Sequence, residues 1–366
     1  MTSILRNGKK LQIPSIPKPK KSSNQKEYTH DQAVELVASF LTQGGKGKTT
    51  VLSGAGASVE SGIRSYRGNQ GHYELHKKYR PIFYHEFIED SDQGRLFRQR
   101  YWARSFFGYI PVQNAQPNRV HYSVAALQYM NLVDKLVTQN VDRLHHRATP
   151  DSLKPDDRIL ELHGTLNFAV VPNHPDHPKK LRSELQAELA TLNPSWAEFA
   201  DSQAKLKQNP DGDVELPSGL TYETFMVPQP TGLEGEHSAF YKPDVVFFGE
   251  SLNSRQKNES IKAIEDADRV LVIGSSLATY SAFRLIKQAI ENKKEVLMLN
   301  VGPTRADDYD VTKIELPAAD VLQGAVKLLA SKLPHDDMLS KLSTSGVNIS
   351  IEDIGPMPDP EATEAK

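Results

Sequence analysis

Short β-type runs, several of them nearly all apolar, each end in turn residues and constrain the fold of this chain more than any other feature of the sequence. The five clearest runs are Thr49-Thr50-Val51-Leu52, Lys135-Leu136-Val137-Thr138, Val245-Val246-Phe247-Phe248, Val270-Leu271-Val272-Ile273 and Val296-Leu297-Met298-Leu299. Each is followed by a turn rich in Gly, Ser, Asn or Asp, and helical patterns such as residues 31–41 lie between several of them. Strands that are apolar on both faces are typical of parallel sheets. We therefore predict an α/β fold with a Rossmann-like, doubly wound parallel sheet, which binds ligands at the carboxyl ends of its strands.

One long stretch interrupts this rhythm. Residues 165–243 are polar and rich in Pro, His, Asn and Glu, which indicates a smaller inserted module. The Rossmann-like domain is then predicted to comprise residues 31–164 and 244–335.

Both ends of the chain are predicted to be tails. Residues 1–26 contain seven Lys or Arg and no acid, so residues 1–30 are predicted to be a basic disordered tail or a targeting presequence. The C-terminal segment 336–366 is Pro-rich and acidic and is predicted to be largely a disordered tail.

The composition excludes several kinds of site and partner. The formal net charge is −2, which gives no sign of nucleic acid or an anionic membrane as a partner. No run approaches the roughly 18 apolar residues of a membrane span. The chain has no cysteine, so disulfides, thiolate nucleophiles and cysteine-based metal sites are excluded.

Two neighbouring segments could bind a phosphate. The segment GKGKTT at 45–50 resembles a triphosphate loop, but Thr42 stands where that motif needs its first glycine, and the segment precedes a strand instead of following one. We interpret it as a linker. The segment GAGAS at 54–58 follows a strand, as a dinucleotide-binding turn does.

The second segment is the first of six motifs that resemble, in order and spacing, the sirtuins, the NAD-dependent protein deacylases. The six are GAGASVESGIRSYRG (54–68), TQNVDRLHHRA (138–148), LELHGTL (160–166), KPDVVFFGE (242–250), VIGSSL (272–277) and LNVGPTRAD (299–307). The resemblance covers residues 30–335. The segments RQRYWARSFFGY (98–109) and GPTRADD (302–308) resemble the class II branch. Its animal mitochondrial members are described as lipoamidases, deacylases and ADP-ribosyltransferases.

The resemblance implies which residues bind NAD. They are Gly54, Ala55, Gly56, Ser58, Ser65, Tyr66, Arg67, Gln139, Asn140, Asp142, Gly274, Ser275, Ser276, Asn300, Val301, Gly302, Ala318 and Asp320. Asn140 and Asp142, which follow a strand, could instead merely cap the next helix.

The resemblance also implies the catalytic and substrate-binding residues. His163 matches the general base, a task that suits imidazole because its ordinary pKa is about 6.5. Asn140 and Asp142 match residues that organise ribose and water. The segment whose edge pairs with a substrate peptide is Val245, Val246, Phe247, Phe248 and Gly249, with Glu250.

Other histidines are predicted to have no catalytic role. His145 and His146 are expected to be solvent-facing helix residues. His72 and His76 lie four apart but lack a third ligand, so no metal is expected there.

The sequence departs from the sirtuin pattern at the zinc cysteines. Val171, His174, Glu234 and His237 stand at those four positions. His174, Glu234 and His237 could still ligate a metal, with His177 nearby, but the loss of thiolates more often means the loss of zinc, so no structural zinc is expected.

A second departure lies in GIRSYR at 62–67. Ser65 replaces an aspartate that helps to hold the nicotinamide carboxamide, and Arg64 replaces a proline. We expect Arg64 to face solvent.

The leading hypothesis is an enzyme, an NAD-dependent protein-lysine deacylase that consumes NAD, transfers the acyl group from lysine to ADP-ribose and releases nicotinamide. Alternatives are a protein mono-ADP-ribosyltransferase that uses the same site, or a degenerate NAD or ADP-ribose binding module. The expected partners are acylated protein lysines and NAD, without nucleic acid or membrane. A monomer in the mitochondrial matrix is expected, with cytoplasm or nucleus as the alternative.

Overall fold

The computed structural model describes residues 5–6, 9–10, 13–16, 26–43, 48–67, 81–202, 219–236 and 238–350. The chain forms two compact units. The larger comprises Met1–Glu74, Gln116–His163 and Leu252–Ile349, and the smaller comprises Leu75–Ala115, Gly164–Ser251 and Ser350–Lys366. The smaller unit therefore also takes in Leu75–Ala115, which the sequence analysis assigned to the larger domain.

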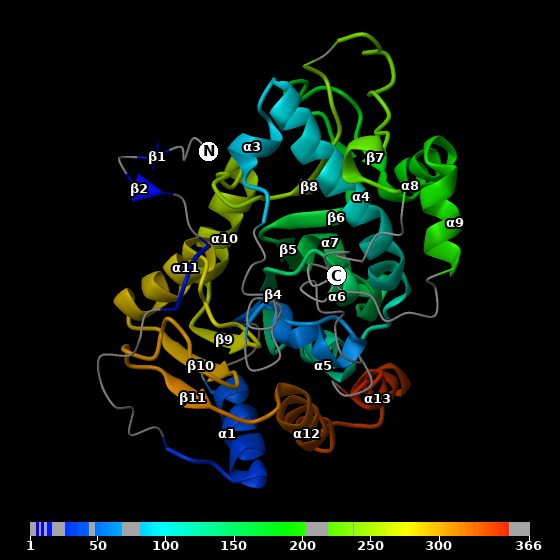
Figure 1. Cartoon of the computed structure of the whole chain (residues 1–366). Helices are drawn as coiled ribbons and strands as arrows, with labels where there is room; N and C mark the ends of the chain where they lie inside the picture. Colours follow the sequence, from blue (N-terminus) through cyan, green and yellow to red (C-terminus); the bar gives the residue numbers. More distant parts are fainter. Residues whose placement is uncertain are drawn as a thin grey trace, which may run out of the picture. The chain divides into compact units, whose positions relative to one another are not determined.

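The larger unit is built on a six-stranded sheet in the order β11-β10-β9-β3-β4-β5, in which every pair is parallel (Figure 1). The strands are β3 (Thr49–Ser53), β4 (Val133–Thr138), β5 (Ile159–Glu161), β9 (Arg269–Ile273), β10 (Glu295–Leu299) and β11 (Thr312–Ile314). Four of the five predicted strands are thus confirmed as members of a parallel sheet.

Helices cover both faces of this sheet. The helices on one face are α1 (His30–Thr42), α5 (Arg119–Tyr129), α12 (Ala318–Ala330) and α13 (Asp337–Thr344), and those on the other are α10 (Ser254–Asp266) and α11 (Tyr280–Glu291). Side chains of a strand alternate between faces, so Val51 packs with the first group and Leu52 with the second. The doubly wound fold is confirmed. Helix α13 lies in the segment that was expected to be largely a tail, because Leu339 and Leu342 are buried in the first core.

Short elements complete the larger unit. They are η1 (Ala55–Ser61), α6 (Leu144–Ala148), η2 (Asp151–Leu153) and α7 (Pro155–Arg158), with a hairpin of β1 (Leu5–Arg6) and β2 (Lys9–Lys10) near the N-terminus. η1 follows β3 and carries the predicted Ala55, Gly56 and Ser58, and the loop between β4 and α6 carries Gln139, Asn140 and Asp142.

The smaller unit contains a three-stranded antiparallel sheet in the order β7-β6-β8. Its strands are β6 (Gly164–Val170), β7 (Lys180–Leu181) and β8 (Lys242–Val245), and its helices are α3 (Tyr84–Phe87), α4 (Asp92–Asn114), α8 (Arg182–Leu192), α9 (Pro194–Ser202) and η3 (Tyr222–Thr224). A separate core holds it together, with Trp102 donating from its indole Nε1 to the Tyr241 carbonyl at 3.0 Å.

The predicted fifth strand at 245–248 is wrong. Strand β8 ends at Val245 and pairs antiparallel with β6, while Val246, Phe247 and Phe248 follow it outside any strand and are only half-buried. A fully apolar run does not distinguish a strand of the parallel sheet from a loop packed on aromatic neighbours. Here Phe247 packs edge-on against Phe87, with ring centroids 5.1 Å apart.

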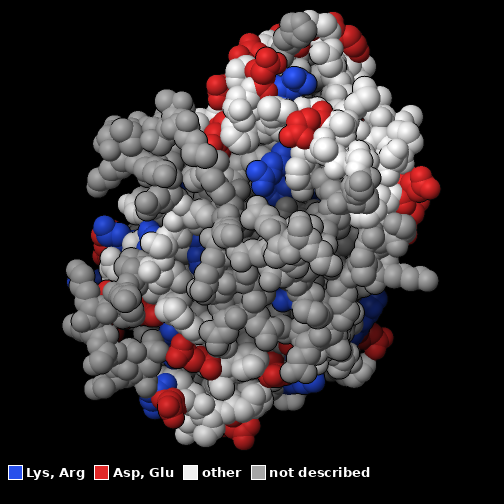
Figure 2. Space-filling view, viewed as in Figure 1, with Lys and Arg blue, Asp and Glu red and all other residues white. Residues whose placement is uncertain are grey.

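Some predictions fall on residues that the structure does not describe, namely the linker glycines at 44–47, His72, His76 and His237. Within the described ranges, no helix has the length and apolar character needed to cross a membrane. On the face drawn in Figure 2, acidic and basic side chains are interspersed, in keeping with the near-balanced charge of the sequence.

Candidate functional site

Two glycine turns pack against each other at the carboxyl ends of the adjacent strands β3 and β9. The Gly54 N–H donates to the Ile273 carbonyl at 3.0 Å, and the Gly56 N–H donates to the Gly274 carbonyl at 2.9 Å. A Cβ on Gly56 would lie 2.8 Å from the Gly274 Cα, and a Cβ on Gly274 would lie 2.5 Å from the Ala57 nitrogen. Gly274 also has a positive φ of 58°. The glycines are therefore required for the contact between the two turns, a reason that the motif alone did not give.

Ser58 of η1 contacts two residues of the loop between β4 and α6 in the larger unit. Its hydroxyl donates to the Asp142 Oδ2 at 2.7 Å and accepts from the Asn140 Nδ2 at 3.0 Å. The other carboxylate oxygen of Asp142 accepts from the Leu144 N–H at 3.0 Å, so this residue does serve the first turn of α6. Burial raises the pKa of Asp142. Ser58, which was predicted in the phosphate loop, thus contacts the predicted ribose-side residues Asn140 and Asp142 in surroundings that are largely withdrawn from water.

A histidine that the sequence analysis missed fixes the direction of these bonds. His121 Nδ1 lies 3.1 Å from the backbone N–H of Asn118 and can only accept there, so the proton must reside on Nε2. Nε2 lies 3.3 Å from the Ser58 oxygen and donates to it, which leaves the Ser58 proton to point at Asp142. Burial lowers the pKa of His121 well below its usual value. Only long-range contacts reveal this role.

Gln139 links the second glycine turn to the strand β4. Its side-chain Nε2 donates to the Ser275 Oγ at 2.7 Å and to the Ser53 carbonyl at 3.2 Å. Ser275 in turn accepts from the Leu277 N–H at 3.2 Å, in a turn where Leu277 has a φ of 54°. The sequence-predicted Gln139 and Ser275 are therefore in direct contact.

His163 lies beside this group as a neutral imidazole with a defined tautomer. Its Nδ1 is 3.3 Å from the Gln139 carbonyl, which can only accept, so Nδ1 carries the proton. The lone pair is then on Nε2, which accepts from the Ser281 hydroxyl at 2.8 Å. Burial lowers the pKa of His163 to about 4. Ser281, at the start of α11, is a partner that the sequence analysis did not identify.

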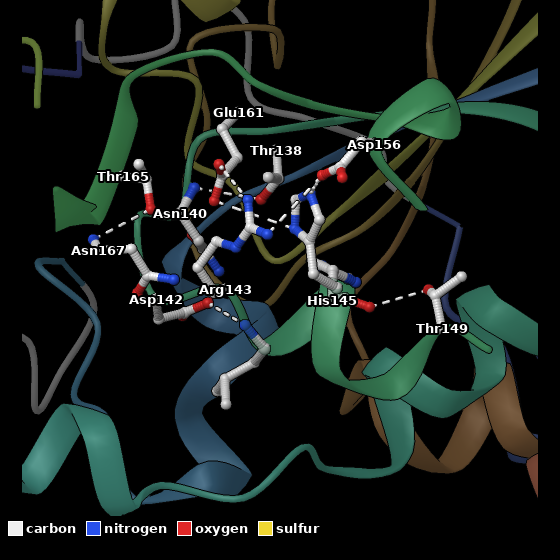
Figure 3. A network of polar contacts seen from close by, with 12 residues as sticks. Thr138, Asn140, Asp142, Arg143, His145, Thr149, Asp156, Glu161, Thr165 and Asn167 are labelled. Atoms are coloured by element: carbon white, nitrogen blue, oxygen red, sulfur yellow. Dashed lines mark hydrogen bonds and ion pairs between the residues drawn. The ribbon is translucent and has the colours of Figure 1, made fainter. Parts of the chain in front are cut away.

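A charged network surrounds the strand that leads to His163. Arg143 Nη1 lies 3.2 Å from the Glu161 Oε2, and Arg143 Nη2 lies 3.7 Å from the Asp156 Oδ1 (Figure 3). Burial raises the pKa of Glu161 to about 7, against the lowering effect of Arg143. Arg143 adopts a left-handed φ of 61° directly after Asp142, and these ion pairs help to hold that conformation.

The expectation that His145 and His146 face solvent is wrong. His145 is 2% exposed and its Nε2 lies 3.0 Å from the Ser53 hydroxyl, while the side chain of His146 is 7% exposed. Burial lowers the pKa of His145 to about 3 and that of His146 to about 4. Helix α6 has only five residues and is covered on most sides, so its sequence does not show an exposed face.

The segment after η1 departs from expectation at one residue. Arg64 was expected to face solvent, but it is 8% exposed, and burial lowers the pKa of its guanidinium. The Ser65 hydroxyl donates to the Arg67 carbonyl at 2.7 Å, and Tyr66 is 49% exposed. Arg67 Nη2 donates to the carbonyl of Pro14 at 2.7 Å.

Further predicted NAD residues lie on the turn after β10 and at the start of α12. The buried Asn300 donates from Nδ2 to the carbonyls of its own turn, Val301 at 3.1 Å and Gly302 at 3.2 Å, and Val301 is 65% exposed. Ala318 begins α12, and Asp320 is paired at 2.6 Å with Arg119 Nη1. No described contact joins these residues to the Ser58 group.

The predicted substrate-binding segment belongs to the smaller unit. Its backbone is fixed by two internal bonds, from the Phe247 N–H to the Glu250 Oε2 at 2.7 Å and from the Glu250 N–H to the Phe247 carbonyl at 3.0 Å. Gly249 has a φ of 85°, and Lys242 Nζ lies 3.0 Å from the Glu250 Oε2. Burial lowers the pKa of this lysine.

The former zinc positions also lie in the smaller unit. His174 Nε2 is 2.9 Å from the Glu236 Oε1, and the Glu234 Oε1 accepts from the Gly232 N–H at 3.0 Å. His177 Nε2 lies 3.0 Å from the Thr231 carbonyl. Over the described ranges no three metal-ligating side chains converge. Among the described candidates, His174, Glu234 and His177 are instead bonded to separate partners.

Comparison with protein families and individual relatives shows which known proteins this chain is similar to. The model of the Sir2 family matches residues 54–281. A "NAD-dependent protein deacylase SIR4" of Batrachochytrium dendrobatidis is 40% identical over 301 residues, which cover 80% of this chain and 93% of that protein. A "NAD-dependent protein deacylase SRT2" of Arabidopsis thaliana is 35% identical over 298 residues, which cover 78% of this chain and 74% of that protein.

The fold is similar to solved structures as well. A structure described as "Structural Basis for the Mechanism and Regulation of Sir2 Enzymes" aligns with a TM-score of 0.56 and 28% identity, over 83% of this chain and all of the other. A "Sir2-p53 peptide-NAD+" structure aligns with a TM-score of 0.55 at 22% identity, over 82% of this chain and 98% of the other, which is evidence for the fold alone.

Proposed function

Because the chain belongs to the Sir2 family, we propose that it is an NAD-dependent protein-lysine deacylase. The reaction consumes NAD and water, moves the acyl group from a lysine to ADP-ribose, and releases nicotinamide and the free lysine. The single observation that carries the proposal is the neutral His163 at the carboxyl edge of the sheet, whose Nδ1 donates to the Gln139 carbonyl and whose unprotonated Nε2 accepts from the Ser281 hydroxyl.

His163 would serve as the general base for a ribose hydroxyl. A base must be unprotonated at working pH and within hydrogen-bond reach of the proton that it takes. A pKa of about 4 keeps His163 neutral, and the 2.8 Å bond to Ser281 supports Nε2 as the atom that accepts. The Ser281 hydroxyl would have to yield this place to the ribose hydroxyl.

The paired glycine turns would lie beside the phosphates of NAD. They stand at the carboxyl ends of adjacent strands of a parallel sheet, the edge at which such folds bind dinucleotides. The N–H groups of Gly54 and Gly56 are themselves used between β9 and the two turns. Side chains at Gly54 or Gly56 would clash with the opposite turn, so only glycine permits this compact edge.

Asn140 and Asp142 would organise the ribose side. The fixed direction of the Ser58 bond leaves the remaining donor and acceptor capacity of Asn140 and Asp142 to a ribose hydroxyl or a water. In the smaller unit, the ordered 245–250 segment would pair with the backbone of the acylated peptide, which suits an enzyme that reads mainly the acyl group.

A mass-spectrometric assay tests the proposal. Peptides that carry acetyl, long-chain acyl, glutaryl or lipoyl lysine are incubated with the purified protein, with and without NAD. The lysine should be freed and nicotinamide released only with NAD, and the His163→Ala variant should be slower by about 10²- to 10⁴-fold. The matched control is His335→Ala, because that side chain is 80% exposed. ADP-ribose added to protein with every acyl-lysine untouched would instead identify a transferase, and binding without turnover would identify a binding module.

We further propose the class II branch, without zinc and as a monomer that binds neither nucleic acid nor membrane. The sequences RQRYWARSFFGY and GPTRADD support the class II branch, and the lack of cysteine supports the absence of zinc. Native mass spectrometry tests the monomeric state and the absence of zinc together, since the expected species has the 40.8 kDa mass of one metal-free chain.

The mitochondrial matrix is the proposed location. The support is the basic, acid-free start of the chain, with seven Lys or Arg in residues 1–26. Fusion of residues 1–30 to a fluorescent protein should direct it to mitochondria, and a diffuse cytoplasmic or nuclear signal would contradict this location.

A further inference from the structure

Two arginines of the larger unit are bound by neighbouring carbonyls of one N-terminal segment. Arg67 Nη2 donates to the Pro14 carbonyl at 2.7 Å, and Arg305 Nη2 donates to the Ser15 carbonyl at 2.8 Å. We call residues 13–16 the N-terminal strap. Because neighbouring Cα atoms are about 3.8 Å apart, the two guanidinium groups lie on the order of 10 Å apart or less.

Both arginines stand on loops at the edge of the sheet where the glycine turns meet. Arg67 follows η1, which begins at the turn after β3. The Arg305 N–H donates to the carbonyl of Ser276 at 3.0 Å, so this arginine is fixed to the turn after β9. The strap therefore joins the segment after β3 to the loop after β10, which is itself bonded to the turn after β9.

The strap holds the Arg305 side chain without neutralising it. The Ser15 carbonyl accepts a hydrogen bond but carries no net charge, and a guanidinium has five donors, so the contact with the strap uses only part of them. Arg305 forms no ion pair with the described residues, and its buried Nε has no hydrogen-bond partner among them. Its guanidinium carbon lies 5.6 Å from the centre of the Phe283 ring. A positive charge is thus kept in place and available for an anion.

The strap itself is suited to a fixed position. Pro14 has a restricted φ and no N–H, so its carbonyl is its only backbone hydrogen-bonding group. Ile13 and Ile16 are half-buried on either side, while Ser15 is exposed.

We propose that the N-terminal strap is part of the NAD site and that it holds Arg67 and Arg305 ready for the phosphates of NAD. This inference rests on the proposed function. Without the strap, NAD would have to order two long side chains itself, and the lost side-chain freedom would weaken its binding.

The test compares two truncations of the full chain by calorimetric titration with NAD and with ADP-ribose. Deletion of residues 1–16 removes the strap, whereas deletion of residues 1–12 keeps it and is the matched control. We expect the longer deletion to weaken binding by roughly five- to tenfold, the size of ordering one or two arginines, and the shorter one to leave it unchanged. The KM for NAD should rise by the same factor with little change in kcat.

Arg305→Ala in the intact chain provides a second route that does not depend on truncation. Binding should weaken, and deletion of the strap from this variant should weaken it by less than in the intact sequence, because the strap then has only Arg67 to hold. Equal binding by both truncations would overturn the proposal while leaving the proposed function intact. Tighter binding after removal of the strap would also overturn it, because the strap would then compete with NAD. No binding of NAD or ADP-ribose by the intact chain would overturn both.

Discussion

The pH dependence of catalysis is a direct test of the environment of His163. An imidazole in water has a pKa of about 6.5, whereas burial lowers the pKa of His163 to about 4. Because Nδ1 donates to the Gln139 carbonyl, protonation of the imidazole would occur at Nε2, the atom that has to act as the base. Lowering the pH therefore tests directly at which pH His163 loses its function as a base.

The two pKa values predict different rates at pH 5. A base with a pKa of about 6.5 would be about 97% protonated and would keep only about 3% of its activity. With a pKa of about 4, roughly 90% of His163 is still unprotonated at pH 5. We therefore expect kcat/KM for NAD at pH 5 to stay within about twofold of its value at pH 7.5, instead of falling about thirtyfold.

The assay measures initial rates of nicotinamide release between pH 4.5 and 8 at constant ionic strength. Circular dichroism at each pH confirms that the enzyme is folded. Ser281→Ala should move the acid limb to higher pH, because the Ser281 hydroxyl donates to Nε2 and favours the neutral imidazole. An acid limb centred near pH 6.5 in the folded, unmodified enzyme would refute the reasoning, since it would mean that His163 is solvated when it reacts.

Three further predictions concern stability. Burial lowers the pKa of His145 to about 3, so below pH 6.5 the unfolded chain binds a proton that the folded chain does not. Acidification from pH 7 to 5 should therefore lower the free energy of unfolding by about 2 kcal/mol through this residue. In urea unfolding, the His145→Asn variant should lose less stability over the same pH range. Gly274→Ala would place a Cβ 2.5 Å from the Ala57 nitrogen, whereas the Cβ of Gly302→Ala, at a similar positive φ, would have nothing within 4 Å. The first substitution should lower the free energy of unfolding by more than ~3 kcal/mol and the second by ~1 kcal/mol. Equal unfolding midpoints would contradict the argument that the two turns require glycine. Arg119→Ala breaks two ion pairs of 2.6 Å and should cost ~1–2 kcal/mol, less at high salt, by the same measurement.

The parallel sheet could be predicted because its signal is local. The confirmed strands β9 and β10 contain apolar runs of four residues, and β3 is buried throughout although two of its residues are threonine, because burial on both faces removes the polar alternation that other strands show. The run 245–248 has the same composition but a different cause, since Phe247 and Phe248 pack on aromatic side chains of the smaller unit. Composition alone does not separate the two cases.

The candidate site was predictable where it depends on motifs and unpredictable where it depends on distant contacts. His163, Gln139 and Ser275 do meet, as their motifs suggested. The partner of the base, Ser281, is 118 residues away in the sequence, and the histidine that orients Ser58 is 63 residues away. Hydroxyls and histidines are common on helices, so no pattern within one segment distinguishes these two.

The two roles that the N-terminus could have are in conflict, and this makes them testable together. A targeting peptide acts before it is removed, whereas the strap must remain in the mature enzyme to hold Arg67 and Arg305. If both proposals hold, cleavage must fall before residue 13, so that the strap stays in the mature enzyme. The first residue of the protein isolated from mitochondria decides the matter by mass spectrometry. A start at or before residue 13 is compatible with the strap, whereas a start beyond residue 16 would restrict the strap to the precursor and leave both arginines to be ordered by NAD alone.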